Sequence, residues 1–395
     1  MKRLAVALAL LAACGQEREK GVVLWHAYTG QERAALEQTA ATWTAAHPDT
    51  PIVLVAVPYD SFADKLTSAI PRGNGPDLFI YPHDRIGDWA DAGTIEPIEF
   101  WVDDARADRF TEQAIGAMAY HGSLWGLPLS AKSIALFVRT DLVSKAPTTT
   151  DELLALAPAM KSREGYALAY PNDDLYFHAP WLHGFGGGVM DKEEGETLAI
   201  ATAQAANAMT FARKLVVDGV VPNGANEQLV ASLFNEGKAA TAMSGPWFVP
   251  QIDKGVPWEV HTLPVVSETG EPAAPFLGAE GILMSAQAHD KQAAFAVMDY
   301  LTSDDAAVVR AKVARQVVAN IHAYDDPEVA KDPALKVFRE QLEHTVPMPK
   351  SHAMRMVWTP YKTQLGEVLT GRVQPGDALL AAEKEINGYV QGAPK

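Results

Sequence analysis

Three polar side chains follow directly on a short apolar segment in the first quarter of the chain. Residues 78–81 form an apolar run suited to a buried strand, and a proline ends it. His83, Asp84 and Arg85 come next, before a short helix predicted for residues 86–92. Open α/β sheets bind ligands beyond the carboxyl ends of their strands, so this carboxylate and guanidinium are placed to grip a ligand. A surface loop with a local Asp84–Arg85 pair is the alternative.

Aromatic residues recur at predicted strand ends and in loops, where burial alone does not require them. Flat rings stack on the apolar faces of sugars, while carboxylates and guanidinium groups hydrogen-bond the hydroxyls around the rim. The mixture favours a carbohydrate site, although core packing is the alternative for any single ring. The aromatic residues that we assign to a ligand are Tyr81, Tyr176, Trp247 and Trp358.

The motifs of metal and nucleophile chemistry are missing from the sequence. There is no HExxH and no GxSxG, and the single cysteine cannot form a ligand set, so we expect no metal, no cofactor and no catalytic residue. A glycosidase needs two carboxyl groups about 5 to 9.5 Å apart. Asp84, Asp173, Asp174 and Glu280 could supply such a pair, which keeps an enzyme open as an alternative.

Length and charge narrow the class of protein further. The chain has 395 residues, enough for two domains with large cores. It carries 49 acidic against 33 basic side chains, a formal net charge of −16. An excess of that sign repels phosphate backbones, so we expect no nucleic-acid partner.

The first residues have the pattern of an export signal. Residues 1–13 combine a basic start with an apolar run well short of the ~20 residues that span a membrane. The ending Leu11-Ala12-Ala13-Cys14 resembles the lipobox of bacterial lipoproteins, which implies a lipid anchor at Cys14 and a tether over residues 14–20. An ordinary cleaved signal is the alternative. We expect a periplasmic or cell-surface protein held at the membrane.

Repeated strand and helix patterns predict an α/β fold. Strands are expected at residues 21–25 and 52–57, each followed by a helix, and Ser61 with Asp64 has the spacing of a capping box for the second helix. Together with the segment around Asp84, these repeats favour a doubly wound sheet. A further strand is expected over residues 130–138.

In order and spacing, several segments resemble a known family: the extracellular solute-binding proteins of ABC sugar importers, and within it the maltose/maltodextrin-binding proteins. The segments are VVLWHAYTGQE, GNGPDLFIYPHDRIGDWADAG, GSLWGLPLSAKSIALF, DDLYF, LFNEGKAATAMSGPW, FLGAEGILMSA, EVAKDP and MPKSHAMRMVW. The resemblance covers nearly all of the chain after the leader. It implies a two-domain periplasmic-binding-protein fold of type II, in which each domain is a mostly parallel sheet flanked by helices and the ligand lies between them.

The resemblance also implies roles for individual residues. Asp84 and Arg85 would bind sugar hydroxyls from the first domain, with Asp64 as an acidic residue beside the site. From the second domain three rings would stack on glucose units and a carboxylate would hydrogen-bond there; these residues are Tyr176, Trp247, Trp358 and Asp174.

Three positions depart from the family pattern. Tyr81 stands where maltose binders usually have tryptophan, and Lys132 where they usually have glutamate. The first loop has Tyr28 and Thr29 in place of an Asp-Lys pair. We keep Tyr81, Lys132 and Tyr28 as candidate ligand-binding residues, and expect the preferred sugar to depend on them.

The same resemblance predicts how the chain is divided. The N-terminal lobe would comprise residues 21–130 and 281–327, and the C-terminal lobe residues 135–279 and 334–395. We expect a monomer that binds maltose/maltodextrin-type oligosaccharides and delivers them to the permease subunits of an ABC transporter. A binder of another neutral sugar or a cyclic glucan, and a secreted carbohydrate-active enzyme, are the alternatives.

Overall fold

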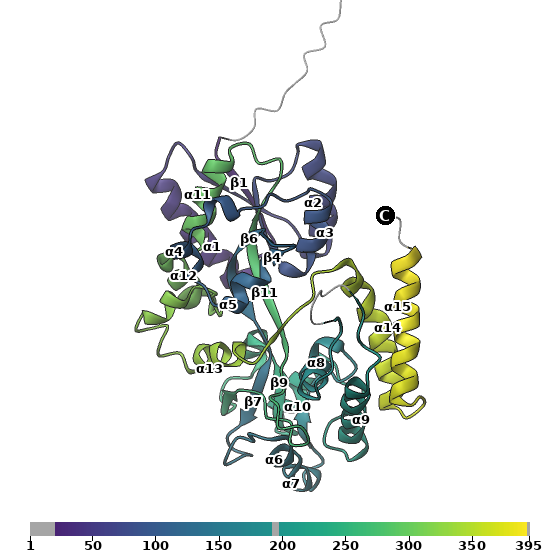
Figure 1. Cartoon of the computed structure of the whole chain (residues 1–395). Helices are drawn as coiled ribbons and strands as arrows, with labels where there is room; N and C mark the ends of the chain where they lie inside the picture. Colours follow the sequence, from purple (N-terminus) through teal and green to yellow (C-terminus); the bar gives the residue numbers. More distant parts are fainter. Residues whose placement is uncertain (1–19, 192–196, 393–395) are drawn as a thin grey trace, which may run out of the picture.

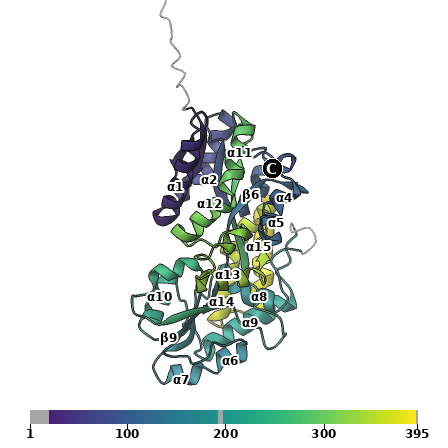
Figure 2. The same cartoon turned by 90° about the vertical axis from the view of Figure 1, so that its left-hand side faces the viewer.

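The computed structural model describes residues 20–191 and 197–392, which form two lobes joined at their centre (Figure 1). The predicted leader and Cys14 lie outside the described residues. Figure 2, turned by 90°, shows the same division, with α1, α2 and α11 in one lobe and α6, α7 and α10 in the other. Among the described helices, none is long and apolar enough to cross a membrane.

The first lobe is built on a sheet with the strand order β12-β11-β3-β1-β2, in which β6 also pairs with β11. Its β1, β2 and β3 are parallel, whereas β11 runs antiparallel to β3 and β6. The strands are β1 (Val22–His26), β2 (Ile52–Ala56), β3 (Leu78–Pro82), β6 (Gly126–Lys132), β11 (Phe276–Met284) and β12 (Val346–Pro347). The helices of this lobe are α1 (Gly30–Ala46), α2 (Tyr59–Ala69), α3 (Ile86–Asp91), α4 (Asp104–Ala107), α5 (Glu112–Ala117), α11 (Lys291–Leu301) and α12 (Asp304–Val309), and a small hairpin joins β4 (Ala119–Tyr120) to β5 (Ser123–Leu124).

The second lobe has its own sheet, with the order β10-β7-β9-β8. Its strands are β7 (Ala135–Arg139), β8 (Tyr166–Ala169), β9 (Ala239–Ser244) and β10 (Trp258–His261). Its helices are α6 (Thr150–Leu154), α7 (Ala157–Lys161), α8 (Leu175–Gly184), α9 (Ala203–Val217), α10 (Glu227–Asn235), α13 (Pro333–Leu342), α14 (His352–Leu369) and α15 (Pro375–Gly392). Helices α14 and α15 pack on each other along one side of this lobe (Figure 1).

The two-domain α/β architecture is confirmed, but the second sheet is not mostly parallel. Only β8 and β9 run parallel there, while β7 is antiparallel to both β9 and β10. The direction of β7 follows from how the chain enters the lobe. Its first residue, Ala135, pairs with Ser244 at the end of β9, so β7 leaves the junction between the lobes while β9 returns to it.

The chain first crosses between the lobes at the break between two strands. The single strand predicted over residues 130–138 is wrong, because β6 ends at Lys132 in the first sheet and β7 begins at Ala135 in the second. Ser133 and Ile134 are buried between them. The chain returns between β10, the last strand of the second sheet, and β11, which pairs with β12, β3 and β6 of the first.

The predicted capping box is also wrong. Helix α2 begins at Tyr59, three residues before the expected start at Phe62, so Ser61 lies inside it and its Oγ donates to the carbonyl of Pro58 at 3.3 Å. Pro58 already has φ −57°, which suits the residue that precedes a first helical turn. The early start brings Tyr59 to the end of β2.

Candidate functional site

The segment after β3 is fixed in place by His83. Its imidazole is buried, accepts from the backbone N–H of Ala279 at 3.1 Å and lies 3.2 Å from the carbonyl of Met348 through Nε2. Burial, aided by the charge of Lys350, lowers the pKa of His83 to about 4, so the ring is neutral at pH 7. A neutral ring that accepts at Nδ1 donates at Nε2, and His83 thereby ties the end of β3 to the crossing strand.

Asp84 is the carboxylate that this turn presents. Its Oδ1 is buried and has no hydrogen-bond partner among the described residues. Burial raises the pKa of the Asp84 carboxyl to about 6, although the neighbouring Arg85 opposes the shift. The ion pair of Arg85 is instead with Asp88, at 3.9 Å, and Asp88 also accepts from Arg355 of α14 at 2.9 Å. The local Asp84–Arg85 pair therefore does not satisfy the carboxylate.

Four aromatic rings from four different elements form a continuous row, three of them in the second lobe and one on β11 of the first sheet. The ring centroids of Trp247 and Tyr176 are 6.2 Å apart, those of Tyr176 and Phe276 6.5 Å, and those of Phe276 and Trp358 6.3 Å. Phe276 is buried at the start of β11, whereas the other three rings are partly exposed. We call these four residues the aromatic row. Its partly exposed faces are suited to stacking.

Local structure sets the ends of the aromatic row. Asp174 caps α8 by accepting from the backbone N–H of Tyr176 at 2.8 Å, which fixes that ring at the helix start. Trp247 follows β9 in a 3-10 helix, Pro246–Gln251, and its Nε1 donates to Glu227 at 3.1 Å. Gly245 makes room for this ring, because a Cβ there would lie 2.0 Å from it.

The first lobe contributes a polar network beside the same crossing strand. Tyr28 is buried and donates its hydroxyl to Glu280 of β11 at 2.8 Å. Lys132 lies 3.8 Å from Glu280 and 3.5 Å from Glu32, which also accepts from Gln316 at 3.0 Å. Glu280 above all, and then Glu32, raise the pKa of Lys132. We call these five residues the polar network.

A cavity of about 570 Å³ lies between the lobes and joins the two groups. Thr29, Glu32 and Lys132 line it from the first lobe, and Trp247 lines it from the second, together with part of α13. Because Phe276 and Glu280 are both on β11, a single strand carries one member of the aromatic row and one of the polar network. The cleft therefore has aromatic and hydrogen-bonding walls on opposite lobes.

Two of the predicted ligand-binding residues of the first lobe, Tyr81 and Asp64, lie outside both the aromatic row and the polar network. Tyr81 is 5% exposed and packs between Tyr59, whose ring stacks on it at 5.6 Å, and Trp89 at 5.0 Å. Tyr59 is 56% exposed and thus presents the open ring here. Asp64 is an exposed residue of α2 and makes no hydrogen bond or ion pair with another of the described residues.

The structure thus brings most of the predicted residues to the junction of the lobes. Asp174 and Tyr28 are engaged there in positioning Tyr176 and Glu280. Sequence reasoning missed four contributors, namely Tyr59, Phe276, Glu32 and Gln316. Tyr59 had a signal, since it is an aromatic residue just beyond a predicted strand end. Within the described ranges, no group of three His, Cys, Asp or Glu side chains is placed to hold a metal ion.

Known proteins resemble this chain in sequence and in fold. A family model described as bacterial extracellular solute-binding protein matches residues 27–308. A maltotriose-binding protein of Pyrococcus abyssi is 29% identical, over 91% of this chain and 79% of its own length. A galactooligosaccharide-binding protein of Bacillus subtilis is 26% identical, over 96% of this chain and 94% of its own. The solved structure of a cyclo/maltodextrin-binding protein complexed with maltotetraose is 27% identical, has a TM-score of 0.89, and matches 96% of this chain and 100% of the other.

Proposed function

The chain belongs to the bacterial extracellular solute-binding proteins, and we propose that it captures a maltose/maltodextrin-type oligosaccharide between its lobes for delivery to an ABC importer. In this proposal residues 21–130 with 281–327 form the N-terminal lobe, and residues 135–279 with 334–395 the C-terminal lobe. The sheet pairing on either side of residues 133–134 supports the first boundary, whereas the start of β11 and all of β12 pair in the first sheet although the division gives them to the C-terminal lobe.

Two observations carry the proposal together: the aromatic row, and the buried Oδ1 of Asp84, which has no hydrogen-bond partner among the described residues. Rings stack on the apolar faces of glucose units, and a carboxylate oxygen without a protein donor accepts from sugar hydroxyls. An anionic ligand fits poorly, because Asp84 would repel it and the ammonium of Lys132 is already shared by Glu280 and Glu32. The site therefore suits a neutral polyhydroxylated ligand.

Binding from both lobes would favour closure around the sugar. A ligand shifts a conformational equilibrium only by its difference in affinity for the two states, and hinge closure is the usual movement of periplasmic binding proteins. One contact between the lobes runs from Asp88 of α3 to Arg355 of α14, one helical turn before Trp358. Asp84 and Trp358 are thereby linked through neighbouring residues of facing helices.

The ligands of two similar proteins favour an α-linked glucan as the ligand here. One of these proteins is a maltotriose-binding protein, and the other was solved in complex with maltotetraose. The galactooligosaccharide-binding relative makes another neutral oligosaccharide the second candidate. A thermal-shift screen over maltose, longer maltodextrins, cyclodextrins and galactooligosaccharides decides between them. A ligand at a hundred times its Kd stabilises the folded state by about 2.7 kcal/mol. If galactooligosaccharides raised Tm and no glucan did, the proposed substrate would be wrong.

We further propose that the protein has no hydrolytic activity on its sugar. Asp84 is free among the described residues, but the three other candidate carboxyls are engaged: Asp173 lies 3.6 Å from Lys362, Asp174 caps α8, and Glu280 is held by Tyr28 and Lys132. A retaining or inverting glycosidase needs a second free carboxyl opposite the acid. Maltohexaose incubated with the purified protein should stay intact, and the appearance of shorter glucans would contradict the proposal.

The membrane anchor at Cys14 is proposed from the sequence alone. One acyl chain binds membranes only marginally, so stable anchoring implies more than one chain on this residue. Replacing Cys14 by serine should release the exported protein from the membrane fraction. Unchanged membrane association would show that something other than Cys14 holds it.

A further inference from the structure

The segment between α13 and α14 returns to the first lobe before α14 begins. Its β12 pairs with the start of β11, and the backbone N–H of Met348 donates to the carbonyl of Leu277 at 3.3 Å. We call residues 346–350 the strap. Figure 1 shows this part of the chain rising from the junction of the lobes to the start of α14. The strap therefore joins the first sheet directly to the helix that carries Trp358.

The side chain of Lys350 fastens the end of the strap to α5. Its Nζ donates to the backbone carbonyls of Gly116 at 3.0 Å and Ala117 at 3.2 Å, and also to that of Ala119. The last carbonyls of a helix have no partner within the helix, and a cation there is stabilised by the helix dipole. Burial lowers the pKa of Lys350 to about 8, so the ammonium is charged at pH 7. Its three N–H donors all have acceptors, which is why a lysine suits this position.

The strap also supports the turn that presents Asp84. The carbonyl of Met348 accepts from Nε2 of His83 at 3.2 Å, and His83 comes directly before Asp84. Burial, and then the charge of Lys350, lower the pKa of His83, and only a neutral ring combines a donor at Nε2 with an acceptor at Nδ1. The carbonyl of Lys350 lies against α3, because a Cβ at Gly87 would be 2.5 Å from it. The strap is thus held on the same part of the first lobe as Asp84.

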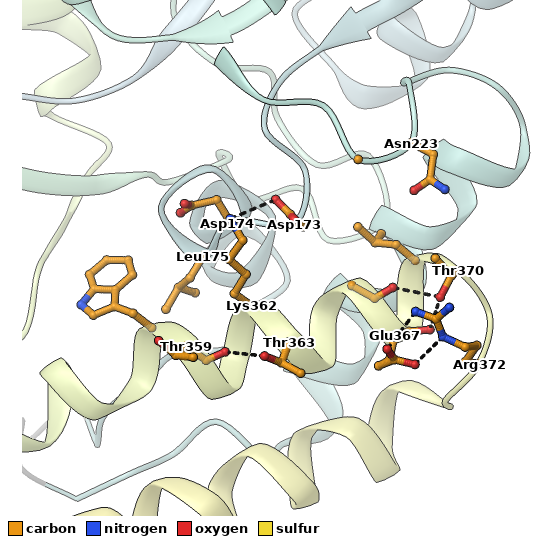
Figure 3. Close-up of a pocket in the computed structure, with 14 residues that line it drawn as sticks. Asp173, Asp174, Leu175, Asn223, Thr359, Lys362, Thr363, Glu367, Thr370 and Arg372 are labelled. Carbon is orange, nitrogen blue, oxygen red and sulfur yellow. Dashed lines mark hydrogen bonds and ion pairs between the residues drawn. The ribbon is translucent and has the colours of Figure 1, made fainter. Parts of the chain in front are cut away.

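Helix α14, by contrast, is attached to the second lobe. Its first buried residues, Ala353, Met354 and Val357, lie in one core cluster with residues of α8, α9 and α15. Farther along the helix, Lys362 lies 3.6 Å from Asp173, just before α8, as the dashed line in Figure 3 shows. The strap and α14 therefore belong to different lobes, although they are almost consecutive in the chain.

Ser351 lies between these two attachments. It precedes α14 with an extended backbone, φ −70° and ψ 153°, and its side chain makes no capping hydrogen bond. Its Oγ is buried and has no hydrogen-bond partner among the described residues. The side chain therefore ties Ser351 to neither lobe. One bond beyond it does reach the first lobe, from Arg355 to Asp88 at 2.9 Å, and a separation of the lobes would break that bond.

We propose that Lys350 is a positioning residue, which makes the strap part of the first lobe, and that α14 pivots at Ser351 when the lobes close on a ligand. The inference rests on the proposed function and adds where one crossing bends. With the strap fixed, Asp84 and the entry point of α14 keep one geometry, so Trp358 approaches Asp84 along a defined path. Releasing the strap from α5 would give the ligand-free protein more arrangements of the lobes, and closure would then cost more conformational entropy.

The pivot is tested on wild type by residual dipolar couplings of backbone amides, measured with and without maltotriose. The amides of Val346, Met348 and Lys350 should fit the alignment of the first lobe in both states, and those of α14 the alignment of the second lobe. Strap couplings that follow α14 would overturn the inference, and so would lobes that keep one relative orientation with the sugar bound.

The role of Lys350 is tested by Lys350→Met, which removes the ammonium and keeps an unbranched side chain. Lys350→Arg is the conservative variant, because it keeps a cation with N–H donors. Lys384→Met is the matched control, since Lys384 is an exposed residue of α15. Calorimetric titration with maltotriose gives the affinity of each variant, and the melting temperature of the ligand-free protein reports whether it folds. Hydrogen exchange of the Val346 and Met348 amides reports whether the strap is released.

We expect Lys350→Met to bind maltotriose about tenfold more weakly and to exchange the strap amides faster. Lys350→Arg should recover most of the affinity, and Lys384→Met should match wild type. A lower melting temperature with unchanged affinity would make Lys350 a residue of stability alone and would overturn its positioning role, while the proposed function would stand. If wild type bound no glucan, the proposed function would fail and this inference with it.

Discussion

Replacing Asp84 by asparagine tests whether this carboxylate binds a ligand or stabilises the fold. The pKa of the buried carboxyl is raised from 3.8 to about 6, so the folded protein holds this proton more tightly than the unfolded chain does. Below pH 3.8 both states are protonated and the site costs nothing. As the pH rises through 6, the ionised group destabilises the fold by up to about 3 kcal/mol, at about 1.4 kcal/mol per pKa unit.

Asparagine has the shape of the carboxyl without its charge. Asp84→Asn should therefore raise the free energy of unfolding of the ligand-free protein at pH 7.5, by an amount that vanishes near pH 3.5. It should also weaken glucan binding roughly ten- to a hundredfold, because a hydrogen bond to a charged acceptor is lost. Urea unfolding at the two pH values and calorimetric titration with maltotriose measure the two effects. Exposed Asp108 supplies the control, Asp108→Asn.

The free energy of unfolding and the glucan affinity test two separate claims about Asp84. Lower stability of ligand-free Asp84→Asn at pH 7.5 would mean that the carboxylate has a stabilising partner and is not poised for a ligand. Higher stability with unchanged affinity would leave Asp84 a destabilising residue outside the sugar site, and the Asp84 turn would be the surface loop of the alternative interpretation.

Two further predictions concern the aromatic row. Trp358→Ala should weaken glucan binding far more than it lowers the Tm of the ligand-free protein, since its ring is only partly buried; a loss of about 3 to 5 kcal/mol in stability with unchanged affinity, as for a core tryptophan, would contradict this. Gly245→Ala should displace the Trp247 ring, because the added methyl overlaps it, and so should lower glucan affinity and change tryptophan fluorescence while the sheet stays intact by circular dichroism; unchanged affinity would show that this ring does not stack on the ligand.

The sequence predicted best those features that depend on neighbouring residues of a single strand or helix. The run at residues 78–81 is buried on both faces of a sheet, and its abrupt end at Pro82 places Asp84 correctly at a strand end. Loop aromatics such as Tyr176 and Trp247 were likewise visible as rings beyond an element's end. These features depend on local order along the chain, which a pattern can report.

Features that depend on the crossing between lobes were not predictable. Phe276 is an apolar residue at the start of a strand and has no pattern that separates it from core, yet it completes the aromatic row. The direction of β7 and the break after Lys132 follow from where the chain enters the second sheet. Tyr81 lies at a strand end, where an aromatic residue is expected to contact a ligand. It is covered instead, because α2 starts early and its Tyr59 stacks on the Tyr81 ring.

Two of the departures from the family pattern, Tyr28 and Lys132, contact the same side chain, Glu280. A lysine at position 132 would place an ammonium in the cleft, where burial without a partner is costly. Glu280 and Glu32 supply opposite charge within 4 Å, and Tyr28, which replaces an acidic residue of the first loop, satisfies Glu280 without adding a third negative charge. An aspartate in the first loop would add a third carboxylate beside one lysine. Tyr28 and Lys132 thus act on the same carboxylate, Glu280, one through a hydrogen bond and the other through its charge.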